Sequence, residues 1–217
     1  EEVSLAFETS GKVTEILFQE GAYVHKGDLL AKINDEPQQA ELRKQEAQLK
    51  LFQDRMYRQN ALLEKEAVSE EAFQEAQANL AALHAEIDRV KANIAQRELR
   101  APFDGVLGLR EVSLGAYVSS TTPIVKLTKM NPLKIEFSVP ERYSGVLKAG
   151  SRLNFTVEGD LEERSAKVYA TDSRVDMDTR TFTVRALYDN SDGALFPGRY
   201  VNVNLLTREY PDAIAAP

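Results

Sequence analysis

The side chains that most often perform catalysis or bind metal ions are few in this sequence and do not cluster. The chain has no cysteine and only two histidines, His25 and His84, which lie far apart. A zinc site needs three or four such ligands close together, so the pattern argues against a metal site. No serine lies in a G-x-S-x-G elbow either. We therefore predict that the protein is not an enzyme and needs no cofactor or metal.

Arg58, Leu62 and Ser69 lie close to the break in a long helical segment, where exposed side chains can contact another protein. Helix positions four apart share a face, so Arg58 and Leu62 are expected on one side of a helix. An arginine and a leucine exposed near the end of a hairpin, with a polar residue beyond, fit a groove between the helices of a partner. A purely structural reading stays open for each residue: a solvated arginine, a leucine flanking a core, and a serine that caps a helix.

A long helical segment must position these three residues. No glycine occurs between Pro37 and Arg97, and proline is tolerated at the start of a helix. The second part of the segment has apolar residues spaced alternately three and four apart, which predicts a coiled-coil seam. These residues are Phe73, Ala76, Leu80, Leu83, Ile87, Val90 and Ile94. The first part repeats Leu42, Leu49, Met56 and Leu63 every seven residues, with Phe52 between them, and Gln45 and Gln59 weaken the other positions.

The break between the two helical parts falls at residues 66–69. Ser69 suits an N-cap, and Glu70 and Glu71 suit the positive end of the following helix. Such a short connection requires the two helices to run antiparallel. We predict an α-helical hairpin over residues 36–99, with two helices of about thirty residues and about 45 Å each.

An internal repeat flanks this hairpin. Residues 21–24, with the sequence Gly-Ala-Tyr-Val, recur at residues 115–118, which is a shift of 94 residues. Both copies alternate short apolar stretches with glycines, as in strands joined by tight turns. We predict a β-sandwich in two halves, residues 1–35 and 100–129. Four glycines are expected to make its turns: Gly11, Gly21, Gly105 and Gly115.

Strand patterns of another kind follow this sandwich. Leu133, Ile135, Phe137 and Val139 alternate until Pro140, and turn signals separate the further strand-like stretches. Those stretches are 153–157, 166–171, 181–188 and 200–206. Five short strands, with a short helix at 141–147, predict a small closed β-barrel over residues 130–207. We read residues 208–217 as a tail that leads into a further, truncated domain. The expected fold class is therefore mainly β, with an inserted helical hairpin.

The motifs and their order resemble the periplasmic adaptors, or membrane-fusion proteins of HlyD-like type, of resistance-nodulation-division (RND) efflux pumps. Residues 11–30 look like the first half of the family's lipoyl-like domain, and residues 101–106 look like the start of its second half. The stretches 175–186 and 196–203 match its barrel. The resemblance implies a periplasmic protein, attached to the inner membrane by an anchor that this fragment lacks. It also implies that the membrane-proximal domain is missing.

The same resemblance gives the three tip residues a role. Adaptors that dock on TolC-type outer-membrane channels have an arginine, a leucine four residues later and a serine seven beyond, which Arg58, Leu62 and Ser69 match. The implied partners are an inner-membrane RND transporter and a TolC-type channel, with adaptor subunits assembled into a hexameric funnel. The implied function is the export of drugs or other small toxic molecules.

Other functions stay open or are excluded by the sequence. An adaptor for an ATP-driven or major-facilitator exporter would share the split sandwich and hairpin. A lipoyl or biotinyl carrier domain would place a lysine on a tight turn between its halves, where this chain has the hairpin. Nucleic acid is excluded as a partner, since the formal net charge is −7 and no basic block occurs. Apolar runs are far shorter than the roughly 20 residues that span a bilayer. With no signal-peptide pattern at its start, we read the chain as a mature, trimmed, soluble fragment.

Overall fold

The computed structural model describes residues 1–65, 67–160 and 162–205. It divides into two compact units. The first is Val3–Leu127, and the second is Glu1–Glu2 together with the chain from Thr128 onward. Each unit has its own cluster of buried apolar side chains. The units are described separately below.

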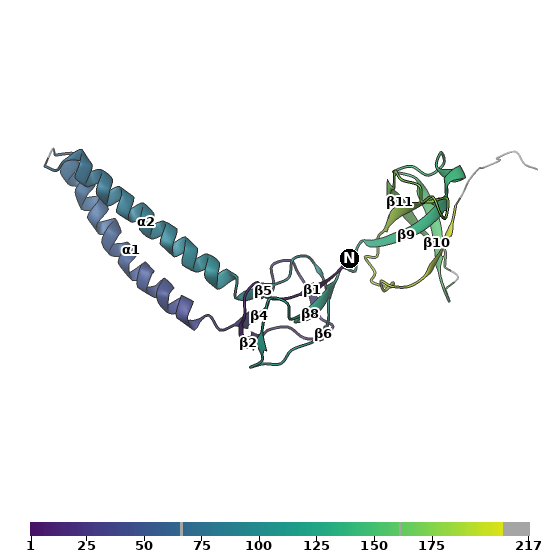
Figure 1. The fold of residues 1–217 in the computed structure, drawn as a ribbon, viewed down its shortest axis with the longest axis horizontal. Coiled ribbons are helices and arrows are strands. Elements are labelled where there is room, and N and C mark those ends of the chain that lie inside the picture. The colour runs from purple at the N-terminus through teal and green to yellow at the C-terminus, as the bar shows by residue number, and fades with distance from the viewer. Residues whose placement is uncertain (66, 161, 206–217) are drawn as a thin grey trace, which may run out of the picture. The chain divides into compact units, whose positions relative to one another are not determined.

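The first unit contains a β-sandwich of two four-stranded sheets (Figure 1). The strand orders are β5-β4-β2-β7 and β1-β8-β6-β3. Each sheet therefore combines strands from both halves of the repeat. The strands are β1 (Glu2–Leu5), β2 (Gly11–Ile16), β3 (Tyr23–Val24), β4 (Leu29–Ile33), β5 (Glu98–Arg100), β6 (Gly105–Arg110), β7 (Tyr117–Val118) and β8 (Val125–Thr128).

The repeat seen in the sequence is also a repeat of hydrogen bonds. The shift of 94 residues carries β2 onto β6 and β3 onto β7 without a change of length. Gly21 N donates to Leu107 O at 3.0 Å, and its counterpart Gly115 N donates to Val13 O at 2.9 Å. Because each half completes the hydrogen bonding of the other, neither half forms a complete sheet by itself.

Two of the four predicted turn glycines are confirmed, and two are corrected. Gly21 and Gly115 have φ of 76° and 86°, a conformation that side chains with a Cβ rarely adopt. Gly11 and Gly105 instead begin strands β2 and β6 and do not have positive φ. At Gly11 the need for glycine is steric, because an added Cβ would lie 3.0 Å from Cδ1 of Ile33.

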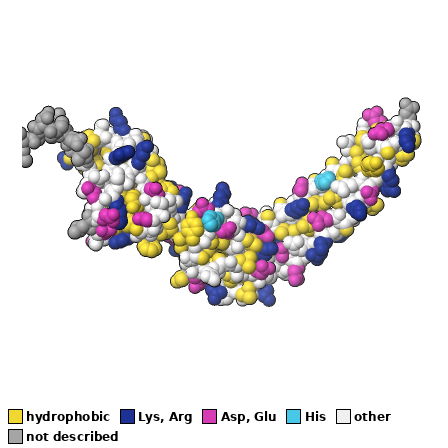
Figure 2. Space-filling model, turned by 180° about the vertical axis from the view of Figure 1, so that it is seen from behind, with side chains coloured by type: hydrophobic (Ala, Val, Ile, Leu, Met, Phe, Trp, Pro, Cys, Tyr) yellow, Lys and Arg dark blue, Asp and Glu magenta, His cyan; other side chains and the backbone are white. Residues whose placement is uncertain are grey.

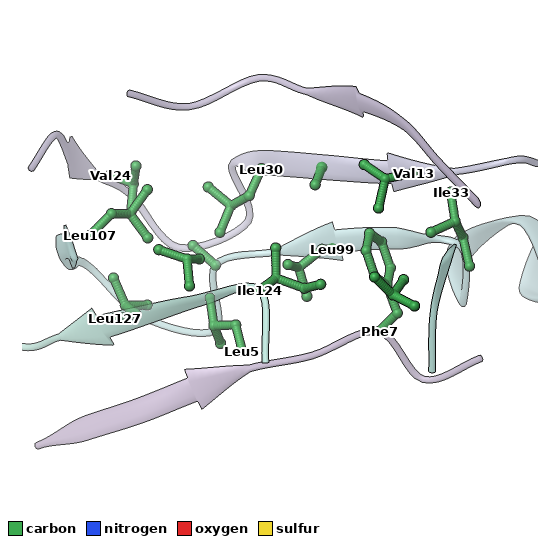
Figure 3. Close-up of a cluster of buried hydrophobic side chains, with 14 residues drawn as sticks. Leu5, Phe7, Val13, Val24, Leu30, Ile33, Leu99, Leu107, Ile124 and Leu127 are labelled. Carbon is green, nitrogen blue, oxygen red and sulfur yellow. The ribbon is translucent and has the colours of Figure 1, made fainter. Parts of the chain in front are cut away.

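The sandwich core is made of aliphatic side chains from both sheets. In Figure 3, Val13 and Leu30 point from one layer toward Leu5, Ile124 and Leu127 of the other. Leu30 and Ile124 are counterparts in the repeat and are 1% and 0% exposed. Burying one such side chain contributes about 1.5–3 kcal/mol, so this core fixes the platform from which the helices extend.

Helices α1 (Glu36–Leu63) and α2 (Glu70–Ala95) form the inserted hairpin and lie side by side (Figure 1). Pro37 lies in the first turn of α1, as predicted. In α2 the predicted seam residues are buried or half-buried, and the most buried are Ala76, Leu83, Ile87, Val90 and Ile94. In α1 the apolar seam residues are only half-buried, and the buried residue is Gln45, at 9% exposed.

A cluster of charged groups lies on strands β4 and β5, next to the point where the chain leaves the hairpin. Glu98, in β5, accepts from Lys32 Nζ at 3.2 Å and from Arg100 Nη2 at 2.7 Å. Burial acts to raise the pKa of Glu98, but the hydrogen bonds from Arg100 and Lys32 outweigh it and lower the pKa. This carboxylate therefore favours the folded state as an anion.

The second unit contains a five-stranded antiparallel sheet in the order β13-β10-β11-β12-β9. Its strands are β9 (Leu133–Pro140), β10 (Arg152–Val157), β11 (Arg164–Thr171), β12 (Thr181–Tyr188) and β13 (Val201–Asn204). The predicted helix at 141–147 is shorter than expected: a single 3₁₀ turn, Glu141–Tyr143, precedes a turn. The predicted tail, 208–217, lies outside the described residues.

Buried Asn190 organises the end of this sheet. Its Nδ2 donates to the carbonyl oxygens of Met130 and Leu195, both at 3.0 Å, and its Oδ1 accepts from Leu195 N at 3.0 Å. A 2% exposed amide with these three bonds is satisfied in its burial. It ties the loop after β12 to the segment that precedes β9.

Candidate docking site at the hairpin tip

Arg58 and Leu62 lie in the last two turns of α1, four residues apart. Both side chains are exposed, and Leu62 is 40% exposed while its neighbour Leu63 is half-buried on the seam. Arg58 forms no hydrogen bond or ion pair with another residue that the structure describes. The hairpin therefore presents an uncommitted guanidinium and an apolar side chain on one face near its tip.

Backbone hydrogen bonds close the end of α1 at Leu62. Its carbonyl oxygen accepts from Lys65 N at 3.2 Å and from Ala67 N at 2.9 Å. Asn60 O accepts from Glu64 N at 3.1 Å, which completes the last turn. These bonds hold the backbone of Leu62 in the turn that ends α1.

Ser69 is the N-cap of α2. It has extended backbone angles, φ −76° and ψ 152°, and its side-chain oxygen accepts from Ala72 N at 3.2 Å. Glu70 and Glu71 follow in the first turn, where the helix dipole favours acidic side chains. The predicted cap is confirmed, and the exposed hydroxyl at the tip keeps hydrogen-bonding capacity for a partner.

The structure brings the three predicted residues to one end of the hairpin, around the connection between the helices. On the face shown in Figure 2, charged side chains of both signs are spread along the helices among apolar ones. The large apolar side chains of the described hairpin that are exposed are Leu51, Tyr57 and Leu62, and of these Leu62 lies nearest the tip.

A polar track within the hairpin seam was not recognised in the sequence as a feature of its own. Gln38, Gln45 and Gln59 continue the apolar seam at intervals of seven and fourteen residues. Gln45 Nε2 donates to Glu41 Oε1 at 2.6 Å. The side-chain oxygens of Gln38 and Gln59 are buried without a partner among the described residues. The spacing of these glutamines by multiples of seven residues is the sequence signal that could have identified the polar track.

Two further observations limit the chemistry of the described residues. No group of three or more histidine, cysteine, aspartate or glutamate side chains among them is arranged to hold a metal ion. Neither of the helices in the described ranges is long and apolar enough to cross a membrane.

Comparison with known families identifies the class of protein that this arrangement belongs to. The family model described as "RND MFP, barrel-sandwich hybrid domain" matches residues 1–129, and "CusB-like, beta-barrel domain" matches residues 133–209. The chain belongs to the RND membrane-fusion protein family, as its resemblance to periplasmic adaptors predicted.

Individual relatives agree with this family. The multidrug resistance protein MdtA of an Escherichia coli strain is 31% identical over 242 residues, which cover 99% of this chain and 57% of that protein. An uncharacterised protein of Haemophilus influenzae is also 31% identical, over 190 residues, 87% of this chain and 50% of that protein. The chain thus spans only about half the length of the curated relatives it matches.

Solved structures with the same architecture include two at 25% identity. A MacA–MexA chimera that carries the Pseudomonas aeruginosa MexA α-hairpin superposes with a TM-score of 0.76, covering 93% of this chain and 74% of that one. A putative efflux transporter from Bacteroides eggerthii gives a TM-score of 0.72, covering 94% and 64%.

Proposed function

We propose that this chain is the core of a periplasmic adaptor that links an inner-membrane RND transporter to a TolC-type outer-membrane channel. The full protein would support export of drugs or other small toxic molecules, since relatives such as MdtA are named multidrug resistance proteins. The match to the RND sandwich family favours this transporter class over ATP-driven or major-facilitator exporters. The role is mechanical: the adaptor holds the two membrane proteins together and performs no reaction.

The observation that carries the proposal is the exposed Leu62 at the end of a helical hairpin, beside Arg58, which has no ion-pair partner among the described residues. We assign these residues, with Ser69, to the contact with the channel. Leu62 would bury its side chain between channel helices, and Arg58 would pair with carboxylates beside that groove. In the complete assembly, anchored at the inner membrane, six copies would form a funnel with their hairpins, packed as coiled coils, directed toward the channel.

Photo-cross-linking in cells tests the channel contact directly. A photoreactive residue at position 62 of the complete adaptor is expected to capture an outer-membrane channel. The same residue at Leu83, which is 8% exposed on the seam, is expected to capture none. Capture of only inner-membrane or cytosolic proteins from position 62, in a folded variant, would refute the channel partner.

A charge substitution tests the same contact by function. Leu62→Asp is expected to abolish export without changing the helical circular dichroism, because Leu62 is exposed beside the seam rather than buried on it. Leu17→Asp is a matched control, since Leu17 is 54% exposed on the sandwich, away from the tip. Normal drug resistance with folded Leu62→Asp would contradict the docking role.

Ser69 needs a substitution that separates capping from docking. Asparagine caps a helix about as well as serine, whereas alanine costs about 1 kcal/mol. If the hydroxyl also contacts the channel, Ser69→Asn keeps the helix and still weakens export. If Ser69→Asn exports normally and only Ser69→Ala fails, Ser69 is a cap alone.

A further inference from the structure

The five-stranded sheet of the second unit has an opening between its two edge strands. Strands β9 and β13 are these edges, and each pairs with a neighbour on one side only among the described strands. Phe137 of β9 and Val201 of β13 stay half-buried, whereas Val139 and Phe155 are each 1% exposed. The opening between the edges therefore leads to the apolar interior of this unit.

A cavity of about 450 Å³ lies at this opening, and all of its lining residues belong to the second unit. The rings of Phe155 and Tyr188 in its lining meet edge to face, with centroids 5.2 Å apart. Cavities of this size with mostly apolar and aromatic linings suit small organic molecules. The apolar lining includes Phe137, Phe155, Val157, Tyr188, Leu195 and Val201.

The charged groups beside the cavity include one cation that has no carboxylate partner among the described residues. Lys134 Nζ donates to Glu1 Oε1, and Glu136 Oε2 accepts from Arg185 Nε at 2.7 Å. Arg199 is exposed, and its Nη2 donates to a backbone carbonyl oxygen at 3.0 Å. A guanidinium pairs well with planar or tetrahedral anions, because its N–H donors form a fork. Arg199 therefore favours a ligand that carries a negative charge.

The turn before β13 holds this arginine between two exposed aromatic rings. Gly198 has φ of 87°, a conformation that favours glycine, and the turn places Arg199 next to Tyr200. Phe196 is 66% exposed and Tyr200 is 83% exposed, and both line the cavity. A ligand in the cavity would remove these rings from water, which favours binding.

We infer that this cavity binds amphipathic organic anions, that is, molecules with a flat apolar ring system and one carboxylate or sulfonate group. The ring system enters between β9 and β13 and packs on Phe155 and Tyr188, and the anionic group pairs with Arg199. The second unit contains no part of the hairpin, so the site is separate from the proposed channel contact. The inference goes beyond the proposed function, because it gives the adaptor a direct contact with small molecules in addition to its mechanical role.

Two fluorescent probes with the same ring system test this site in the complete adaptor. Anilinonaphthalene sulfonate carries a negative charge, and phenylnaphthylamine carries none. The sulfonate probe is expected to bind in a saturable manner, with one probe for each subunit. Amide hydrogen exchange is expected to slow in β9 and in residues 195–201 when the probe binds, and to stay unchanged in the hairpin.

Substitutions separate the contribution of charge from that of the cavity. Arg199→Ala is expected to lower the affinity for the sulfonate probe about five- to tenfold and to leave the affinity for the uncharged probe unchanged. Arg174→Ala is the matched control, since Arg174 is exposed and does not line the cavity. Val201→Phe narrows the opening and is expected to lower the affinity for both probes. Circular dichroism verifies that each variant is folded, and the Arg199→Ala comparison stands alone if Val201→Phe does not fold.

Three results would overturn the inference. One is no saturable binding by the folded adaptor, which includes the case that another segment of the complete protein fills the opening. The others are equal effects of Arg199→Ala and Arg174→Ala on the sulfonate probe, and slowed exchange only outside the cavity. Leu62→Asp is expected to leave probe binding unchanged, so failure of channel docking and failure of this site are distinguishable.

Discussion

Gln59 places in the hairpin seam a buried amide oxygen that has no hydrogen-bond partner among the described residues, and replacing Gln59 with leucine is expected to stabilise the hairpin. A buried acceptor that lacks a hydrogen bond costs about 1–3 kcal/mol. Leucine and glutamine have similar helix propensities, so the helix itself is not weakened by the change. Counted from the helix ends, the matching residue of α2 is Gln74, and the buried seam residue nearest to that height is Ala76, which has a small side chain. We expect Gln59→Leu to raise the local free energy of unfolding by about 1–2 kcal/mol.

Amide hydrogen exchange read by mass spectrometry measures this local change. Because the chain has two units, a single melting temperature would mix their transitions. About 1.4 kcal/mol corresponds to a tenfold change in an equilibrium, so amides near the tip of both helices should exchange about tenfold more slowly. Amides of the β9–β13 unit should not change.

Two other glutamines serve as controls for this reasoning. Gln45 has a hydrogen bond from its Nε2 to Glu41, so Gln45→Leu loses a bond and should stabilise less than Gln59→Leu. Gln53 is exposed on the side of α1, so Gln53→Leu should leave exchange unchanged. Equal effects of Gln59→Leu and Gln53→Leu, or faster exchange in Gln59→Leu, would show that the seam amide is not an energetic defect.

Three further substitutions test the folded units. Gly11→Ala is expected to destabilise the sandwich by about 1–3 kcal/mol in chemical denaturation, because the new Cβ overpacks against the core; an unchanged midpoint would contradict this. Asn190→Ala is expected to cost the second unit about 2–4 kcal/mol, since it leaves buried backbone groups unpaired. Glu98→Gln should destabilise the first unit by about 1–2 kcal/mol at pH 7. The pKa of Glu98 is lowered in the folded state, so its stabilisation is present above the unfolded pKa, about 4.3, and disappears as pH falls through the folded value. The difference in amide exchange of the first unit between Glu98→Gln and the unmodified chain should therefore shrink as the pH falls below the unfolded pKa.

The sequence predicted α2 better than α1 for a physical reason. The seam of α2 is apolar at every position, so its three- and four-residue spacing was clear in the sequence. The residues predicted from that spacing are buried or half-buried. In α1 the same period passes through Gln38, Gln45 and Gln59, and polar residues carry no hydrophobic signal. The spacing placed Gln45 and Gln59 at seam positions, but only the structure shows that their side-chain amides are buried there.

Turn and strand glycines show a second limit of the sequence. The sequence does not distinguish a glycine that adopts positive φ in a turn from a glycine that avoids a steric clash in a strand. Both Gly21 and Gly11 were therefore predicted to make turns. Gly11 differs from Gly21 because it packs closely against Ile33, and no local sequence pattern contains this long-range contact. For the tip, spacing placed Arg58, Leu62 and Ser69 at one end of the hairpin, whereas the exposure of their side chains, and the lack of an ion-pair partner for Arg58 among the described residues, required coordinates.

The hairpin is most firmly packed toward its base, and this gradient suits a docking arm. Leu83, Ile87, Val90 and Ile94 of α2 are buried in the half next to the sandwich, whereas Ala76 is the buried residue of the tip half. Small and polar seam residues near the tip bury less apolar area, so opening there costs less free energy than at the base. A tip that adjusts at low cost can fit a groove between channel helices, while the base transmits the position of the sandwich. Gln59→Leu should therefore weaken export even though it makes the protein more stable. Normal export together with slower amide exchange at the tip would show that docking does not need the tip to adjust.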